Sequence, residues 1–144
     1  MKILVAVDFS TASEAVLKAA KTYAKQLQAE VFLIHVEPPE PAFIGYEPGP
    51  QTVRDQVAHT MKTEHVRLKK DAGALEKTGV KVTPLLLQGA SGETIVAEAE
   101  RLQVSLIIIG SHGHSVFRKM LVGSTSEGVL RKSKIPVMII PVKG

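Results

Sequence analysis

The chain has 144 residues, 44% of them hydrophobic and 22% charged, which is the usual composition of one globular domain with its own core. Cysteine is absent, and this excludes disulfide bonds, thiolate nucleophiles and cysteine-based metal sites. The formal net charge of +4 is too small to indicate a nucleic-acid-binding protein. We therefore treat residues 1–144 as one domain and expect no nucleic acid among its partners.

The charge is unevenly distributed along the chain. Residues 1–100 hold eleven basic and thirteen acidic side chains, whereas residues 101–144 hold seven basic side chains and one acidic residue, Glu127. A local excess of positive charge attracts anions. The sequence therefore predicts that an anionic ligand binds in the last third of the chain.

The first apolar run, Ile3–Val7, is interrupted by Asp8. A secretory signal peptide needs an apolar stretch of ~7–15 residues, and a membrane span needs ~18. No stretch of the sequence meets either requirement, so we expect a cytoplasmic protein that does not insert into a membrane.

Five short apolar runs are the candidate strands: Ile3–Val7, Val31–Val36, Val80–Leu87, Val104–Ile109 and Pro136–Val142. Their near-continuous apolar character is typical of parallel strands that are covered on both faces. Segments with helical periodicity lie between the runs.

The first helical segment follows Asp8, and in it Thr11 and Glu14 have the spacing of a capping box. One face of this helix carries Val16, Ala20, Tyr23, Ala24 and Leu27. The second helical segment is longer and can end at Gly79. Its apolar face carries Val53, Val57, Met61, Leu68, Ala72 and Leu75.

Between the first two helical segments, Glu37–Pro50 fits neither a helix nor a strand. It contains five prolines together with Phe43 and Tyr46. Connections in α/β folds are typically ~2–6 residues long, so this one is unusually long. Two interpretations stay open: a surface loop, or a lid or partner surface for which the aromatic side chains would be needed.

Ser91 is the predicted N-cap of a third helix, whose inner face carries Ile95, Ala99 and Leu102. A fourth helix is predicted over 124–134, with basic residues in its last turn, where the helix dipole favours cations. This alternation of strands and helices predicts an open, doubly wound α/β fold with a five-stranded parallel sheet and helices on both faces. Such sheets bind ligands at the carboxyl ends of the strands, near the topological switch point.

The strongest candidate for a ligand site lies between Gly110 and Ser126. Gly110 ends the fourth apolar run, Gly113 follows three residues later, and Gly123 directly precedes Ser124, Thr125 and Ser126. Exposed backbone amides, the positive end of a helix dipole and hydroxyl donors are together typical of a phosphate site. The alternative is that these glycines only shape turns.

The spacing Gly110-x2-Gly113-x9-Gly123-Ser124 resembles the G-x2-G-x9-G-[ST] signature of the universal stress protein family, in its ATP-binding branch. The resemblance extends over nearly the whole chain, through the opening ILVAVDFS, the second-strand LIHV and the closing IPVMIIPV. It implies a Rossmann-like sheet of order 3-2-1-4-5 with ATP bound at the switch between strands one and four. It also implies homodimers joined through the last strand, Pro136 to Val142.

The resemblance further implies a role for each matching residue. Asp8 would hydrogen-bond the ribose with Ala6 beside it, and Val36 would meet adenine through its backbone. The first part of the glycine segment would wrap the ribose and phosphates, and its last part would bind the β- and γ-phosphates through amides and hydroxyls. The implied nucleotide-binding residues are Ala6, Asp8, Val36, Gly110, Ser111, His112, Gly113, His114, Ser115, Val116, Gly123, Ser124, Thr125 and Ser126. Mg²⁺ or Mn²⁺ would be carried by the phosphate oxygens, with few or no protein ligands.

Several of these residue types have other roles open to them. The Asp8 carboxylate could serve only to satisfy backbone amides at a helix start. His112 and His114 lack a third ligand of suitable spacing, so we expect no metal site there. His35 is expected to be a hydrogen-bonded histidine of the sheet. No nucleophile elbow surrounds Ser124 and no general base is identifiable, so no catalytic residue is predicted.

We expect a nucleotide-binding regulatory protein, a homodimer whose ATP occupancy changes its interactions. The alternative is an enzyme of the adenine-nucleotide α-hydrolase-like group, which hydrolyses ATP slowly or transfers a nucleotidyl group, with Arg118 and Lys119 as a cationic clamp. A third possibility is an interaction module in which the glycines are purely structural.

Overall fold

The computed structural model describes residues 1–39, 51–111 and 122–141, and the side chains of 51–53 are outside this description. The predictions for most of the Glu37–Pro50 segment, for His112 to Val116, for Arg118 and Lys119 and for Val142 therefore lie outside the described residues.

The described residues form strands and helices that alternate along the chain: β1 Lys2–Ala6, α1 Ala12–Gln26, β2 Glu30–Glu37, α2 Gln51–Glu76, β3 Val82–Gln88, α3 Ser91–Leu102, β4 Leu106–Gly110, α4 Ser124–Lys132 and β5 Val137–Ile140. All strand pairs are parallel, and the strand order is β3-β2-β1-β4-β5. The α/β class, the five-stranded parallel sheet and its order are thus confirmed.

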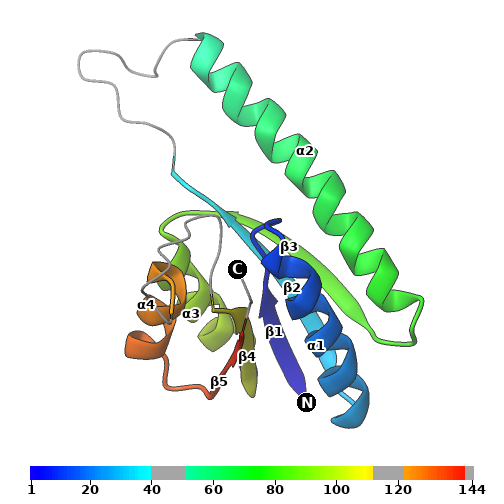
Figure 1. Cartoon of the computed structure of the whole chain (residues 1–144). Coiled ribbons are helices and arrows are strands. Elements are labelled where there is room, and N and C mark those ends of the chain that lie inside the picture. Colours follow the sequence, from blue (N-terminus) through cyan, green and yellow to red (C-terminus); the bar gives the residue numbers. More distant parts are fainter. Residues whose placement is uncertain (40–50, 112–121, 142–144) are drawn as a thin grey trace.

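Helices cover both faces of the sheet (Figure 1). Alternate residues of β1 enter the two cores, Ile3 and Val5 beneath α1 and α2, and Leu4 beneath α3 and α4. Because successive side chains of a strand point to opposite faces, a strand covered on both sides must be apolar at every position. This is the physical reason for the continuous apolar runs in the sequence.

The start of α1 differs from the predicted capping box. Thr11 is the N-cap residue, but its backbone is helical (φ −60°, ψ −23°) and its side chain makes no capping hydrogen bond. The backbone amide of Ala12 instead donates to Oγ of Ser10, at 3.3 Å. The predicted inner face of α1 is also too wide, because Tyr23 and Leu27 are exposed.

Among the described side chains of α2, those that are buried lie in its C-terminal half. Its buried residues are Leu68, Ala72 and Leu75. The predicted core residues Val57 and Met61 are half-buried, and the N-terminal half of the helix extends beyond the sheet (Figure 1). Gly79 adopts a φ of +93° just after the helix, as expected of a terminating glycine. No helix within the described ranges is long and apolar enough to cross a membrane.

The ends of α3 and α4 differ in detail from the sequence-based expectation. Ala90, not Ser91, is the N-cap of α3, because the extended backbone ends one residue earlier than predicted (φ −72°, ψ 121°). α4 begins at Ser124 as predicted but ends at Lys132, two residues before Lys134. The helix stops there because Ser133 is extended (φ −77°, ψ 133°) and its Oγ accepts the amide of Ile135 at 3.0 Å.

Candidate functional site

Three neighbouring strands, β2, β1 and β4, end at the same edge of the sheet, where the strand order reverses. Ala6 is the last residue of β1 with Asp8 just beyond it, Val36 lies near the end of β2, and Gly110 ends β4. The carboxyl ends of parallel strands at a switch point are the usual ligand site of this class of fold. The structure therefore brings these predicted residues together at one edge.

Ala6 and Val36 belong to the hydrophobic core beneath α3 and α4, and each is less than one-tenth exposed. Their side chains are held by core packing. A polar contact from Val36 to a ligand would have to come from its backbone, because the valine side chain has no polar atom.

Asp8 organises the turn between β1 and α1. Its Oδ1 accepts hydrogen bonds from the Ser10 amide at 3.0 Å, from Ser10 Oγ at 2.5 Å and from Ser13 Oγ at 3.3 Å. The carboxylate thus has the structural role at the helix start that the sequence left open. A contact between Asp8 and a ribose stays a prediction.

The first turn of α4 is fastened to the end of β4. The backbone amide of Gly123 donates to the carbonyl of Ser111 at 2.6 Å, and the buried hydroxyl of Ser126 donates to the carbonyl of Gly110 at 2.6 Å. The Ser111 amide in turn donates to Ile140 of β5 at 2.9 Å. The N-terminus of α4 is therefore held in place beside the switch point.

The N-cap of α4 is a glycine that the backbone does not require. Gly123 has φ −71° and ψ 166°, an extended conformation that any residue adopts. Serine, threonine, aspartate and asparagine are preferred at this position because their side chains accept the first-turn amides. Glycine offers no such side chain, so the N-cap residue itself leaves these amides and the positive end of the helix dipole uncovered. Such a helix start favours an anion.

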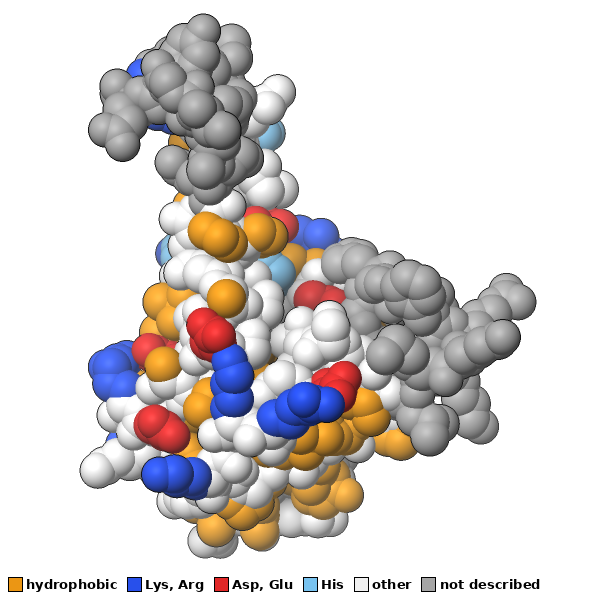
Figure 2. All heavy atoms as spheres, turned by 90° about the vertical axis from the view of Figure 1, so that its left-hand side faces the viewer, with side chains coloured by type: hydrophobic (Ala, Val, Ile, Leu, Met, Phe, Trp, Pro, Cys, Tyr) orange, Lys and Arg blue, Asp and Glu red, His pale blue; other side chains and the backbone are white. Residues whose placement is uncertain are grey.

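Two basic side chains of α4 lie away from this helix start. Arg131 and Lys132 lie at the other end of α4, where they pair with Glu127 at 2.7 Å and with Glu93 at 2.6 Å. On the side where α3 and α4 lie, basic and acidic side chains are indeed neighbours (Figure 2). Arg101 likewise pairs with Glu98. Within the described residues, Arg101, Arg131 and Lys132 thus belong to ion pairs, and an anion bound in the last third of the chain stays a prediction.

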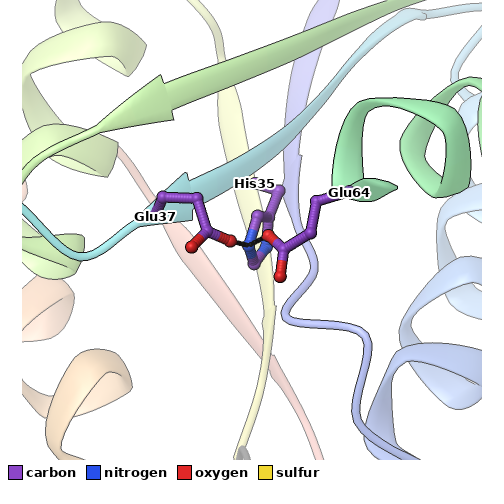
Figure 3. A group of neighbouring side chains, drawn as sticks. All are labelled: His35, Glu37 and Glu64. Atoms are coloured by element: carbon purple, nitrogen blue, oxygen red, sulfur yellow. Dashed lines mark hydrogen bonds and ion pairs between the residues drawn. The ribbon is translucent and has the colours of Figure 1, made fainter. Parts of the chain in front are cut away.

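A second polar cluster surrounds His35 on β2. Its Nδ1 lies 2.7 Å from the carbonyl oxygen of Val7, and its Nε2 lies 2.6 Å from both Glu37 Oε1 and Glu64 Oε2. The two carboxylates approach the ring from different sides, Glu37 from β2 and Glu64 from α2 (Figure 3). The ring of Phe9 packs against the imidazole at a centroid distance of 4.4 Å. The prediction of a hydrogen-bonded sheet histidine is thus confirmed.

The convergence of the two glutamates on His35 was not predicted from the sequence. One signal was present, because His35 and Glu37 are two positions apart on a strand and therefore share a face. Glu64 carried no such signal, since only the packing of α2 on the sheet brings it to the same place.

Comparisons with known proteins find relatives that match nearly the whole chain. The sequence profile described as "Universal stress protein family" matches residues 1–141. The universal stress protein MJ0577 of Methanocaldococcus jannaschii is 31% identical over 157 residues, which cover 99% of this chain and 95% of the relative. The universal stress protein YxiE of Bacillus subtilis is 33% identical over 145 residues, covering 96% and 97%.

Solved structures also superpose on nearly the whole chain. The structure of MJ0577 superposes with a TM-score of 0.86 at 30% identity and covers 99% of this chain and 96% of that one. A universal stress protein from Archaeoglobus fulgidus, solved in complex with dAMP, has a TM-score of 0.67 at 24% identity and covers 97% of both chains. A universal stress protein in complex with cAMP has a TM-score of 0.69 at 20% identity, covering 98% and 96%.

Proposed function

Because the chain belongs to the universal stress protein family, we propose that it binds an adenine nucleotide, ATP, at the edge of the sheet where β1 and β4 are neighbours. The observation that carries the proposal is the start of α4, a glycine-capped helix N-terminus fastened beside the switch point. The family members solved with dAMP and cAMP support an adenine nucleotide as the ligand class.

In this proposal the phosphates bind at the N-terminus of α4. The backbone amides of Ser124, Thr125 and Ser126 point out of a helix start and suit the β- and γ-phosphates. The hydroxyls of Ser124 and Thr125 add donors. The Ser126 hydroxyl already donates to the Gly110 carbonyl and positions the helix. Mg²⁺ or Mn²⁺ would be carried by the phosphate oxygens.

The rest of the nucleotide would extend along the carboxyl edge of the sheet. Asp8 would accept a hydrogen bond from the ribose, beside Ala6, and the Val36 backbone would meet adenine. Gly110, Ser111 and residues 112–116 would wrap the ribose and the phosphates. The resemblance to the family implies this assignment, and the strand ends that the fold brings together support it.

We further propose that the protein is a cytoplasmic homodimer joined through β5. This strand is the last of the sheet, and Val137, Met138, Ile139 and Ile140 are all half-buried although apolar. Hydrophobic side chains also gather on the lower part of the face seen in Figure 2. The opposite edge strand, β3, contains Pro84, which has no amide hydrogen and disfavours strand addition.

Nucleotide occupancy would then act as a regulatory signal, because a ligand shifts the equilibrium between two states by its difference in affinity for them. The sequence predicts no catalytic residue, so we expect any hydrolysis of ATP to be slow and secondary.

The first experiment is to denature the purified protein and identify the released nucleotide by chromatography and mass spectrometry. We expect an adenine nucleotide, and calorimetry of the stripped protein should show tighter binding of Mg-ATP than of Mg-GTP. Absence of a released nucleotide together with absence of ATP binding would overturn the proposal. Sustained multiple turnover of Mg-ATP would instead favour the hydrolase alternative.

A further inference from the structure

Apart from the proposed nucleotide site, the described residues bring three metal-ligating side chains together: His35, Glu37 and Glu64, whose ligand atoms all lie within 4.8 Å of one another. This cluster is on the other face of the sheet from the core that contains Ala6 and Val36. His35 and Val36 are consecutive in β2 and therefore point to opposite faces, and Glu64 reaches the cluster from α2. An ion held here would be separate from one carried on nucleotide phosphates.

The number of hydrogens in the cluster does not match the number of acceptors. The Val7 carbonyl can only accept, so Nδ1 of His35 must be the protonated nitrogen that donates to it. Nε2 carries at most one hydrogen, yet two carboxylate oxygens lie 2.6 Å away. Oε2 of Glu64 is buried and has no hydrogen-bond donor among the described residues. Neutral imidazole would present a lone pair to two carboxylates, and imidazolium would leave one negative charge uncompensated.

We propose that His35, Glu37 and Glu64 bind a divalent first-row transition-metal ion, represented by Zn²⁺, through Nε2 and one oxygen of each carboxylate. Imidazole nitrogen and carboxylate oxygen are ordinary ligands of such ions. Metal-ligating histidines almost always donate the other ring N–H to a carbonyl or carboxylate, which is what Nδ1 does here with Val7. The proposed site thus contains both the ligands and the group that fixes the ligand nitrogen.

The geometry needs only a small adjustment to accept the ion. Tetrahedral Zn²⁺ with bonds of about 2.0–2.2 Å holds its ligand atoms roughly 3.3 Å apart. The present separation of each carboxylate oxygen from Nε2 is 2.6 Å, so each must move outward by less than an ångström. The Glu64 side chain retains 21% of its exposure, which provides a route for the ion and for a water as the fourth ligand.

The position of the site gives the ion a structural effect. Glu64 lies one helical turn before Leu68, which is the first of the described α2 side chains to be buried in the core. Beyond this turn the N-terminal half of the helix extends away from the sheet (Figure 1). The ion would fasten α2 to β2 where hydrophobic packing ends, and so stabilise the helix.

The test is a titration of the nucleotide-free protein with Zn²⁺, measured by competition with a chromophoric chelator and by thermal unfolding. We expect one Zn²⁺ per chain and a Tm that rises with Zn²⁺ concentration. Glu64→Gln and Glu37→Gln should each weaken Zn²⁺ binding by at least about 10–100-fold. Loss of a residue that only supports a metal ligand already costs this much affinity. Without metal, Glu64→Gln should not lower the Tm, because it removes one of the two carboxylates that face the single hydrogen of Nε2.

The matched control is a double variant of the exposed α2 histidines, His59→Gln and His65→Gln, which should bind Zn²⁺ as the unaltered protein does. The proposal is overturned if the nucleotide-free chain binds no stoichiometric Zn²⁺, if Glu64→Gln binds it with unchanged affinity, or if the double variant loses it. Since no nucleotide is present, none of these results depends on the proposed ATP site.

Discussion

At the scale of single residues, two serines of one helical turn have different surroundings. Ser126 is buried and donates its hydroxyl to the Gly110 carbonyl, whereas Ser124 is exposed at the first position of α4. A buried hydrogen bond contributes to folding, and its loss leaves the partner unpaired. Substitution of Ser126 should therefore lower the stability of the fold, whereas substitution of Ser124 should weaken ligand binding.

Ser126→Ala should lower the free energy of unfolding by about 1–3 kcal/mol, because the Gly110 carbonyl loses its donor. Ser124→Ala should change it by less than about 0.5 kcal/mol, as is usual for an exposed residue, but should weaken ATP binding. Urea denaturation measures the first quantity and calorimetry the second. Equal losses of stability in the two variants would contradict the assigned role of Ser126.

At the scale of secondary-structure elements, α3 and α4 begin in similar ways. Both N-cap residues, Ala90 and Gly123, have extended backbone, and neither makes a capping hydrogen bond with its side chain. Only α4 begins at the switch point of the sheet. The pair therefore allows a comparison between a helix start that is merely uncapped and one that we propose to be reserved for a phosphate.

Ala90→Ser should stabilise the protein by ~1 kcal/mol and leave ATP affinity unchanged. Gly123→Asp should change stability by only about a few tenths of a kcal/mol, since glycine is already tolerated at an N-cap. Its carboxylate would, however, occupy the first-turn amides and repel phosphate, and like charges in contact cost several kcal/mol. We therefore expect at least a roughly tenfold weaker affinity for ATP by calorimetry. Unchanged affinity in Gly123→Asp would contradict a phosphate site at α4.

A second test at this scale concerns the contact between α3 and α4. The Nζ of Lys132 donates to Glu93 at 2.6 Å and holds the pKa of that exposed carboxyl below its ordinary value of 4.5. Because the folded pKa is lowered, the ion pair stabilises the fold above pH 4.5, and this contribution is lost as pH falls through the folded pKa. In an NMR titration, Lys132→Gln should raise the pKa of Glu93 toward 4.5, whereas Lys134→Gln should not. No change in Lys132→Gln would show that the ion pair is absent in solution.

At the scale of the whole molecule, the sheet has two different edges. β5 has apolar, half-buried side chains, and β3 contains a proline. An apolar edge strand is prone to pair with a second copy of itself, and a proline at an edge opposes this. We therefore expect that the dimer forms at the β5 edge.

The chain has no cysteine, so a single introduced thiol reports on one position. Lys143→Cys, placed after β5, should give a symmetric disulfide-linked dimer on mild oxidation. Lys81→Cys, beside β3 with its side chain 78% exposed, should stay monomeric in denaturing gels. A crosslink at Lys81 and none at Lys143 would assign the interface to the other edge.

Much of the fold could be predicted from local patterns. The strand runs and the helix periodicity gave the class, and the resemblance gave the strand order. Helix ends were less accurate. Thr11 is the N-cap of α1 but makes no capping hydrogen bond with its side chain. Residue type favours Ser91 as the N-cap of α3, but Ala90 has that position, because the N-cap depends on where the preceding extended segment ends. The ion pair between Lys132 and Glu93 could not be predicted, because the two residues are 39 positions apart and meet only where α4 packs beside α3.

Continuous apolar strands and amphipathic helices are local properties of the chain, so the doubly covered parallel sheet follows from the order of residues alone. The same order fixes which residues follow the strands and so reach the carboxyl edge. The hydrogen bond from the Ser126 hydroxyl to Gly110 and the meeting of Glu64 with His35 and Glu37 depend on the folded arrangement. These contacts join residues far apart in the sequence, and their geometry depends on how the helices pack on the sheet.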